Sequence, residues 1–430
     1  MVKNKNIYLI PCLGFLLVIF IGWISLMMPI CNTGGITSFD ALFTSVSATC
    51  VNGLTTVDIS QKYTFLGQIV IAIITEIGAI GFIAFISFIL NLKKKKMSLS
   101  EILLLSSALN DDNYKRLKQR LKEIIKYTLS IQVIGAIFLS IDFIPRFGIK
   151  NGAWYSIFHS ITAFCNASFD LFGSESLSIF ANNIYVNIIL IFLMFLGSIG
   201  YFVIEDIIEC IKKKSFIHIS FHTKIVLVTS LIIYIVSIIL IKIAEPSLTI
   251  LQTIFTSVNV RTTGFSTINM SNTTTMTKLI ISLLMMIGGA PGSTSGGIRI
   301  TSFAILALIV RDTLRNKKDI VVYYKKIDMQ TIRQAITNIV ICCILVLTAM
   351  FLFDKVQDIG LDKNLFMCVS AFSATGLSVV DVSNLNFAAK IILVILMYIG
   401  RVGPISILSI FILKKKENKN VEYVSGNVML

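Results

Sequence analysis

Eight long apolar runs dominate the pattern of hydrophobic and polar positions along the chain. They cover residues 7–28, 64–92, 124–144, 184–211, 225–243, 276–310, 332–353 and 387–413. Each run is close to or longer than the roughly 20 residues that an α-helix needs to cross the core of a bilayer. The first run is too long for the apolar part of a secretory signal, and no small-residue cleavage site follows it. The pattern therefore predicts eight membrane-spanning helices.

Four shorter amphiphilic segments lie between successive pairs of these runs. They cover residues 37–47, 154–162, 249–257 and 363–370, and they are too short to span a membrane. A hairpin that enters the membrane as a half helix and returns through an irregular stretch fits this arrangement. Irregular backbone at membrane depth is tolerated only where it is buried in protein or lines a wet cavity. We therefore expect the four hairpins to share one axis.

One short phrase follows each of the four amphiphilic segments. Its clearest copy is SAFSATGLS at 370–378, and weaker copies lie at 47–55, 162–170 and 258–266. Alignment on the glycine puts Gly53, Ser168, Gly264 and Gly376 in register. A single copy would favour a contact between helices, since such contacts need small residues. Four copies in the same context indicate an internal repeat whose units line a pore.

The sixth apolar run is interrupted by GGAPGSTSGG at 288–297. Five glycines and Pro291 within ten residues prevent a continuous helix. The outgoing runs of the other three units carry only pairs of glycines at corresponding depth (78 and 81, 197 and 200, 400 and 403). We therefore expect only the third outgoing helix to be broken outright. An asymmetry of this kind in a repeated scaffold suggests a moving part.

Composition and charge agree with a membrane protein. The chain is 55% hydrophobic and 14% charged, and its mean hydropathy is +0.84. A net charge of +15 could suggest nucleic-acid binding, but 27 of the 38 lysines and arginines fall in loops that share one side if every run spans. This is the positive-inside pattern. It predicts a multi-pass protein of the cell membrane with both termini cytoplasmic, and it argues against nucleic-acid binding.

The sequence offers little support for an enzyme. The eight cysteines form no CxxC pair, and the three histidines are scattered. No cluster of titratable groups falls at one depth of the predicted spans, as an active site would need. The glycine-rich stretch lacks the GK[ST] ending of a phosphate-binding loop. We therefore predict no catalytic residues and no covalent cofactor, and any nucleotide must bind a partner.

Taken together, the four phrases, GGAPGSTSGGIR at 288–299 and GRVGP at 400–404 resemble the Trk/Ktr/HKT superfamily of cation transporters over nearly the whole chain. The chain is most similar to the Ktr-type potassium uptake membrane subunit. The resemblance implies an all-α membrane protein of four membrane-pore-membrane repeats, with eight transmembrane helices and four re-entrant pore half helices around a central pore. It also implies potassium uptake, often sodium-dependent, by a homodimer docked on a cytosolic nucleotide-binding regulatory ring.

The predicted repeats divide the chain into domains. They cover residues 1–96, 124–214, 215–310 and 331–416, with cytoplasmic linkers at 97–123 and 311–330 and a cytoplasmic tail at 417–430.

The resemblance assigns a filter and a gate to particular residues. In the filter, backbone carbonyls replace the hydration shell of potassium, and its residues are Val51, Asn52, Gly53, Asn166, Ala167, Ser168, Thr262, Thr263, Gly264, Ala374, Thr375 and Gly376. The gate lies beneath the filter and comprises Gly288, Gly289, Gly292, Ser293, Thr294, Ser295, Gly296, Gly297 and Arg401.

Two filter positions depart from the family pattern. Ser168 stands where family members usually have glycine, and Asn52 stands where threonine is more usual. The side chain of Ser168 constrains the backbone and intrudes on the ring. An alternative function is therefore a sodium-permeable or weakly selective channel or transporter of monovalent cations.

Two arginines within the membrane are candidates for function. Arg401 is near the middle of its run, so we expect it to form a latch with the 288–297 loop rather than to reach the membrane surface. Arg261 precedes the third filter glycine by three residues. It is expected to pair with a carboxylate such as Asp58, Asp170 or Asp381, or to be a solvated charge at the mouth.

Three carboxylates lie within or near the inner ends of the outgoing runs: Glu76, Glu205 and Asp206. They could couple proton or sodium movement, but pairing with nearby lysines is the commoner explanation for such groups.

Overall fold

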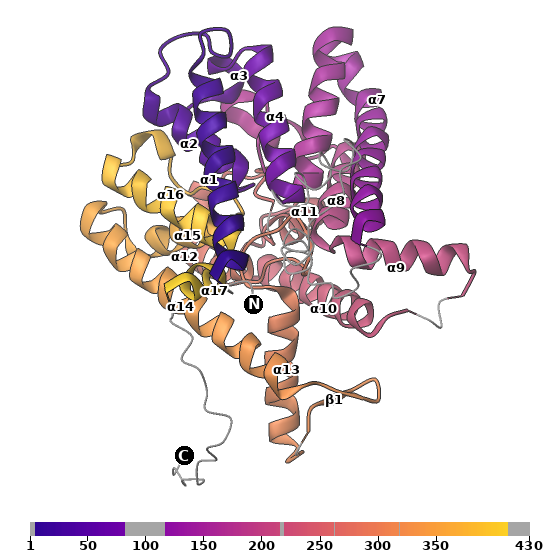
Figure 1. The fold of residues 1–430 in the computed structure, drawn as a ribbon. Coiled ribbons are helices and arrows are strands. Elements are labelled where there is room, and N and C mark those ends of the chain that lie inside the picture. Colours follow the sequence, from indigo (N-terminus) through magenta and orange to yellow (C-terminus); the bar gives the residue numbers. More distant parts are fainter. Residues whose placement is uncertain (1–4, 82–116, 216–218, 262, 318, 412–430) are drawn as a thin grey trace.

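The computed structural model describes residues 5–81, 117–215, 219–261, 263–317 and 319–411. These residues are helical, apart from loops and one small antiparallel hairpin of β1 (Val321–Val322) and β2 (Lys325–Lys326). The amphiphilic segments form short helices, and the apolar runs form the longer helices around them (Figure 1).

The first unit consists of α1 (Lys5–Met27), α2 (Ser38–Thr49), α3 (Ile59–Lys62) and α4 (Phe65–Ile80). Thr37 and Asp40 form a capping box that starts α2, as their spacing favours. The helix α4 ends at Gly81, which has a left-handed φ of 91°. The rest of the predicted run to residue 92 lies outside the described residues.

The second unit begins with one long element, α7 (Leu117–Cys165). Gly148 interrupts it with a φ of 80°, so α7 joins a membrane helix to the second short helix. The turn η1 (Gly173–Phe180), α8 (Ile184–Ser198) and α9 (Tyr201–Lys212) follow.

The apolar run 184–211, predicted as one span, does not form one continuous helix. The axes of α8 and α9 differ by 103°, and α9 runs sideways out of the helical body (Figure 1). The break falls at Gly200, whose φ of 88° cannot continue an α-helix.

The third and fourth units repeat the arrangement. The third contains α10 (Phe221–Ala244), α11 (Ile250–Asn259), η2 (Met270–Asn272), α12 (Thr275–Met286) and α13 (Ile300–Leu314). The fourth contains α14 (Met329–Val356), α15 (Leu361–Ser373), η3 (Val382–Asn384), α16 (Phe387–Val402) and α17 (Pro404–Phe411). The predicted span 387–413 is therefore also interrupted, because Gly403 adopts a φ of 94°.

Four helices of the described residues are long and apolar enough to cross a membrane, and the bent pair α8 and α9 could count as a fifth. The four segments are Leu9–Met27, Lys122–Cys165, Phe221–Ala244 and Met329–Val356. Three of them are incoming helices, and the fourth contains one. The expectation that only the third outgoing helix is broken is wrong, because glycines also end or bend the other three.

The core lies where the short helices meet the longer ones, with α2 against α1 and α4, and α15 against α12, α14 and α16. Large apolar side chains such as Leu231, Ile235 and Ile239 of α10 are exposed on the outside. An outer surface of this kind suits lipid. The short helices are buried inside this shell, where they contribute both large apolar side chains such as Phe43 and Phe366 and small polar ones such as Ser47 and Ser370.

Candidate functional site

The four short helices end in the same way, within the first residues of the repeated phrase. In the first, second and fourth units a backbone N–H at the residue before the aligned glycine position bonds a carbonyl five residues earlier. These bonds are Asn52 to Ser47 (2.8 Å), Ala167 to Thr162 (2.9 Å) and Thr375 to Ser370 (3.0 Å). In the third unit Gly264 itself bonds Asn259 (3.3 Å). Such bonds close a helix C-terminus, so the repeated phrase is a repeated helix stop.

The backbone after each helix stop visits the left-handed region at alternate residues. The aligned positions have φ values of 97° at Gly53, 45° at Ser168, 81° at Gly264 and 81° at Gly376. Two residues earlier, Val51, Asn166 and Ala374 have φ values of 57°, 61° and 56°. The corresponding third-unit residue, Thr262, lies outside the described residues. Alternation of this kind turns successive carbonyls in an unusual direction, and glycine adopts it at the lowest cost.

The four phrases contact one another in a closed order. A Cβ added to Gly53 would overlap Ala167 of the second unit, and one added to Gly376 would overlap the carbonyl of Asn52. A Cβ added to Gly264 would overlap the carbonyl of Thr375. The remaining junction is a hydrogen bond of 2.6 Å from the hydroxyl of Thr263 to Asn166 Oδ1. Each unit thus touches the next, and the fourth touches the first.

Asn52 and Ser168, the two departures from the family pattern, both bridge units. The amide of Asn52 donates to the carbonyls of Ser370 (3.0 Å) and Ala371 (3.1 Å), at the end of α15. The hydroxyl of Ser168 donates to the carbonyl of Asn52 (3.0 Å). The same hydroxyl occupies the space that a Cβ on Gly53 or Gly376 would need. Ser168 therefore fills part of the centre of the ring and ties up one of its carbonyls.

The structure brings the candidate filter residues together around this centre. They are Val51, Asn52, Gly53, Asn166, Ala167, Ser168, Thr263, Gly264, Ala374, Thr375 and Gly376.

A cavity of about 470 Å³ opens on the ring from one side. Gly53 and Ser168 form part of its wall, together with three carboxylates, Asp58, Asp170 and Asp381. Burial raises the pKa of Asp170 to about 6, against the opposing effect of its hydrogen bonds from Ser176 and the Phe172 N–H. Carboxylates that line a cleft raise the local concentration of cations. This cavity is therefore suited to gather cations at the ring.

The loop between α12 and α13 lies against the other side of the ring. The side chain of Asn166 donates to Thr294 Oγ1 (2.7 Å), which ties the loop to the second phrase. A Cβ on Gly296 would lie 2.8 Å from the Cβ of Ala374 in the fourth phrase. Ser293, Thr294 and Ser295 are buried. The candidate gate residues Gly288, Gly289, Gly292, Ser293, Thr294, Ser295, Gly296 and Gly297 thus form one loop under the ring.

Bonds to α8 and α9 hold this loop in place. The N–H groups of Ala290 and Thr294 donate to the carbonyls of Ser198 (2.9 Å) and Gly197 (3.3 Å), at the end of α8. The N–H of Tyr201, at the start of α9, donates to the carbonyl of Gly292 (3.1 Å). The bend between α8 and α9 therefore supplies the seat of the loop.

Arg401 contacts the loop, as the latch hypothesis requires. One nitrogen donates to the carbonyl of Thr294, and another donates to the carbonyls of Gly78 (2.6 Å) and Ala79 (3.0 Å). Arg401 of α16 therefore joins the end of α4 to the loop. Two of its partners are carbonyls at the C-terminal end of α4, and the third belongs to the loop.

A second arginine on the loop was missed by sequence reasoning. Arg299 is the last residue of the GGAPGSTSGGIR stretch, and it donates to the carbonyls of Ser295 (2.9 Å) and Ala290 (3.5 Å). Its place directly after the glycine-rich stretch was the available signal. It braces the loop from within.

Both expectations for Arg261 are wrong. Its side chain is 1% exposed, so it is not a solvated charge at the mouth. It pairs with none of the expected carboxylates. Instead, its guanidinium lies 4.6 Å from the ring centre of Tyr234 and donates to the carbonyl of Gly288 (3.2 Å). Arg261, which lies just after the short helix α11, thus supplies a third guanidinium group that contacts the loop.

Among the described residues, Glu76 and Asp206 are held by partners other than the expected lysines. Glu76 accepts hydrogen bonds from Gln132 (2.7 Å) and Cys165 (3.1 Å). Asp206 accepts one from the N–H of Ser220 (2.9 Å), at the start of α10. The donors are an amide and a thiol for Glu76 and a backbone N–H at the start of α10 for Asp206, rather than lysines.

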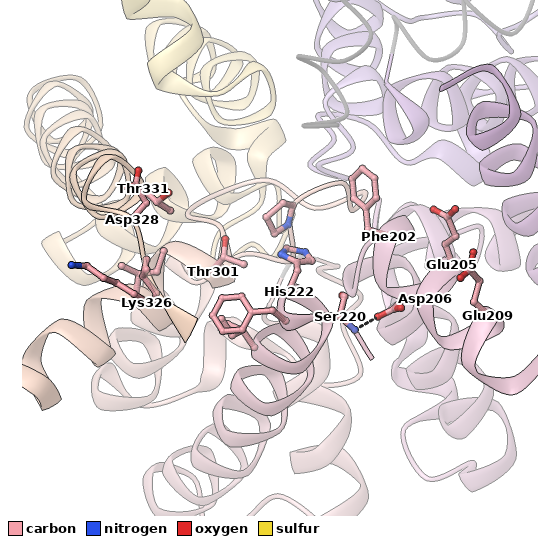
Figure 2. A pocket seen from close by; sticks show the side chains of 15 residues that line it. Phe202, Glu205, Asp206, Glu209, Ser220, His222, Thr301, Lys326, Asp328 and Thr331 are labelled. Atoms are coloured by element: carbon pink, nitrogen blue, oxygen red, sulfur yellow. Dashed lines mark hydrogen bonds between the residues drawn. The ribbon is translucent and has the colours of Figure 1, made fainter. Parts of the chain in front are cut away.

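A second cavity, of about 760 Å³, reaches the loop at Pro291. Figure 2 shows Glu205, Asp206 and Glu209 along one of its walls and Lys326 and Asp328 on the opposite wall. It lies between α9, α10 and α13 and the start of α14. The ring and the loop therefore separate two cavities, and carboxylates line both.

No group of three or more His, Cys, Asp or Glu that could hold a metal ion occurs in the described parts of the chain. The eight cysteines are all free thiols.

Comparison with known proteins identifies the family. Residues 14–423 match the family described as TrkH, cation transport protein. The chain is similar to the Ktr system potassium uptake protein B of Bacillus subtilis (strain 168), at 33% identity over 97% of this chain and 95% of that protein. It is 32% identical to the Ktr system potassium uptake protein B of Vibrio alginolyticus, over 97% of this chain and 93% of that protein.

Two further proteins extend the comparison. The potassium/sodium uptake protein NtpJ of Enterococcus hirae is 32% identical over 97% of this chain and 95% of its own length. The crystal structure of the potassium transporter TrkH from Vibrio parahaemolyticus shares the fold, with a TM-score of 0.74, 16% identity and coverage of 96% of this chain and 86% of that chain. The chain therefore belongs to the TrkH family of cation transport proteins, and it is a multi-pass membrane transporter rather than an enzyme.

Proposed function

We propose that the protein takes up potassium through the ring formed by its four repeated phrases. The observation that carries the proposal is the closed contact order of the phrases, each of which contains the C-terminal end of a short helix. Helix C-termini are negative, and carbonyl oxygens in a ring can replace the hydration shell of a monovalent cation. Four of each at one point favour a dehydrated alkali ion. The names of the relatives, as potassium uptake proteins, support the choice of ion.

The finer architecture that we propose is four membrane-pore-membrane units around this ring, with eight membrane crossings and both termini cytoplasmic. The cavity lined by Asp58, Asp170 and Asp381 is then the outer mouth, and the cavity of Figure 2 is the inner one. Inward movement of one cation gains about 2.3 kcal/mol per 100 mV of membrane potential. Uptake therefore needs no ATP hydrolysis in this chain.

The loop 288–297 is the proposed gate. It lies under the ring, it is buried, and guanidinium groups from three different helices or loops hold its carbonyls. Arg401 joins it to α4 and therefore acts as a latch. Because the relatives are components of Ktr systems, we propose that a homodimer of this chain works with a cytosolic nucleotide-binding ring that releases the latch.

A second candidate function is sodium permeation or weak selectivity among monovalent cations. The specific observation in its favour is Ser168, whose hydroxyl binds the carbonyl of Asn52 and fills space at the ring. A carbonyl engaged in this way is a weaker ligand for potassium. The name of the Enterococcus hirae relative, which includes sodium, is consistent with this candidate.

The test is growth of a potassium-uptake-deficient bacterium on low potassium, with the chain expressed alone or together with a Ktr-type cytosolic subunit. Gly376→Ser adds a side chain where the carbonyl of Asn52 lies, and it should abolish growth. The matched control is Gly34→Ser, since Gly34 also has a left-handed φ, of 95°, but no atom within 4 Å of its added Cβ. Failure of the unaltered chain to support growth under either condition would overturn the proposal.

A further inference from the structure

Glu76 of α4 is a buried carboxylate without a counter-charge. Its Oε2 accepts hydrogen bonds from Gln132 Nε2 (2.7 Å) and Cys165 Sγ (3.1 Å), both on α7. Its Oε1 is buried and has no hydrogen-bond partner within the part of the chain that the structure describes. No basic side chain of the described residues pairs with it. A charge in this position must be neutralised, because an unpaired carboxylate in a low-dielectric interior is very costly.

Two further buried oxygens lie in the same region. The phenol of Tyr201, at the start of α9, lies close to the hydroxyl of Thr128 on α7 and within electrostatic range of Glu76 and Cys165. The hydroxyls of Tyr201 and Thr128 are both buried. One unpartnered carboxylate oxygen and two buried hydroxyls therefore lie in the region that joins α4, α7 and the start of α9. Water could satisfy the hydroxyls, but it would leave the carboxylate charge uncompensated.

We propose that Glu76, Thr128 and Tyr201 form a binding site for a monovalent cation, a proton or a sodium ion, that neutralises the carboxylate. Carboxylate and hydroxyl oxygens are hard ligands, which suit both of these ions and do not suit soft metals. The remaining titratable or charged groups at the site are Cys165, and Arg401, whose charge acts on both Cys165 and Tyr201. On α2, which also packs against α4, Cys50 faces Arg401.

Two hydrogen bonds connect the site to the proposed gate, one from the backbone of Tyr201 and one from the residue that follows Cys165. Tyr201 donates its N–H to the carbonyl of Gly292 in the loop. Cys165 directly precedes Asn166, whose amide donates to Thr294 of the same loop. Occupancy of the site therefore biases the position of the loop. This consequence rests on the proposed function, whereas the existence of the site does not.

Binding is tested on the purified full chain in detergent, with potassium held at saturation so that the ring is occupied throughout. Sodium chloride replaces choline chloride at constant ionic strength, and in a second series the pH rises from about 6 to about 8. A ligand that binds the folded state raises the Tm, here by about 1 to 3 °C for a chain of this length. We expect the Tm of the wild type to rise with sodium, or to fall as the pH rises. In Glu76→Gln the Tm should no longer respond.

Two variants complete the binding test. Asp319→Asn is the matched control, because Asp319 is an exposed carboxylate that pairs with Lys326 and lines neither cavity, and it should keep the response. Tyr201→Phe keeps the shape of the side chain and removes one proposed ligand, so the half-maximal sodium or proton concentration should rise about tenfold. This variant still tests the site if Glu76→Gln does not fold. A wild-type Tm that responds to neither ion, or an unchanged response in Glu76→Gln, would overturn the proposal.

Transport separates this inference from the proposed function. In proteoliposomes, potassium flux should depend on the same ion that shifts the Tm, and Glu76→Gln should remove that dependence. A dependence that persists in Glu76→Gln contradicts the coupling to the gate. A wild-type chain that moves no potassium, yet retains the Tm response, contradicts the proposed function and leaves the cation site supported.

Discussion

The outgoing runs of all four units are ended or interrupted at glycines, but the breaks differ in what they do. In the first, second and fourth units a single left-handed glycine marks the break: Gly81, Gly200 and Gly403 have φ values of 91°, 88° and 94°. In the third unit a loop of ten residues replaces that glycine, and this loop contacts the phrases of the second and fourth units. A glycine break frees carbonyls, and a loop long enough to reach the ring can then use them as its attachment points.

The comparison predicts its largest effect at the latch. Arg401→Ala removes the hydrogen bonds from the loop and from the end of α4. Loss of about 1.4 kcal/mol of closing free energy raises an opening equilibrium tenfold, so basal cation flux without a cytosolic partner should rise by about that factor or more. The measurement is flux in proteoliposomes. Arg146→Ala, which breaks an ion pair with Asp142 on α7, should leave flux unchanged. Equal flux in Arg401→Ala and Arg146→Ala would contradict the latch hypothesis.

The next largest effect distinguishes Gly200 from Gly403, two glycines with similar φ values. A Cβ on Gly200 would lie 2.8 Å from the carbonyl of Pro291 in the loop, whereas one on Gly403 would meet only Ser406 Oγ, at 3.7 Å. Both alanine variants should lose about 1 kcal/mol of stability through backbone strain. Only Gly200→Ala should also change flux, by several-fold. Flux measured beside the Tm of each variant checks this, and equal flux changes would mean that the breaks act alike.

A smaller effect is expected at the ring, where Ser168 differs from its three glycine counterparts. Ser168→Gly removes the strain of a serine in a left-handed backbone conformation, which should raise the free energy of unfolding by about 1 kcal/mol. It also frees the carbonyl of Asn52. The ratio of potassium to sodium flux should rise about threefold to tenfold, since one more carbonyl can then face the ion. Flux of each ion into proteoliposomes gives the ratio. An unchanged ratio would remove Ser168 from the account of selectivity.

The smallest effect is a pH dependence at the outer mouth. Burial raises the pKa of Asp170 from 3.8 to about 6, so the carboxyl gains its charge as the external pH rises through about 6. Cation uptake should therefore increase about twofold over that range, through attraction at the mouth, and Asp170→Asn should flatten the profile.

The same shift affects stability with a defined sign. The folded protein binds this proton more tightly than the unfolded chain, so the contribution of Asp170 to the free energy of unfolding falls as the pH rises from 3.8 to about 6. A Tm that rises over this range in the wild type relative to Asp170→Asn would contradict the assignment.

The repeated fold elements could be read from the sequence because they depend on local pattern. Apolar runs predicted the incoming helices, and the phrase around Gly376 marked four helix stops. The loop 288–297 was evident because proline and several glycines fall together. Single glycines such as Gly200 gave too weak a signal, since a lone glycine is also tolerated inside a helix. The bend of 103° that follows Gly200 depends on the loop packed against it.

Side-chain partners were predicted less well than backbone geometry. The contact between Arg401 and the loop was expected from the depth of Arg401 in its run and from the family resemblance. The surroundings of Arg261 and Glu76 did not, because they depend on which helices pack together. Tyr234 lies 27 residues from Arg261 in sequence, and Gln132 comes from a different unit than Glu76. The sequence also suggested lysine partners for buried carboxylates, whereas the fold supplied an amide and a thiol.

The most direct test of the central claim is anomalous diffraction from crystals of the protein grown with thallium(I), a heavy substitute for potassium. The account predicts anomalous density at the centre of the ring, within reach of the carbonyls of the four phrases at Gly53, Ser168, Gly264 and Gly376. Density at other places with none inside the ring, although the ring is intact, would contradict it.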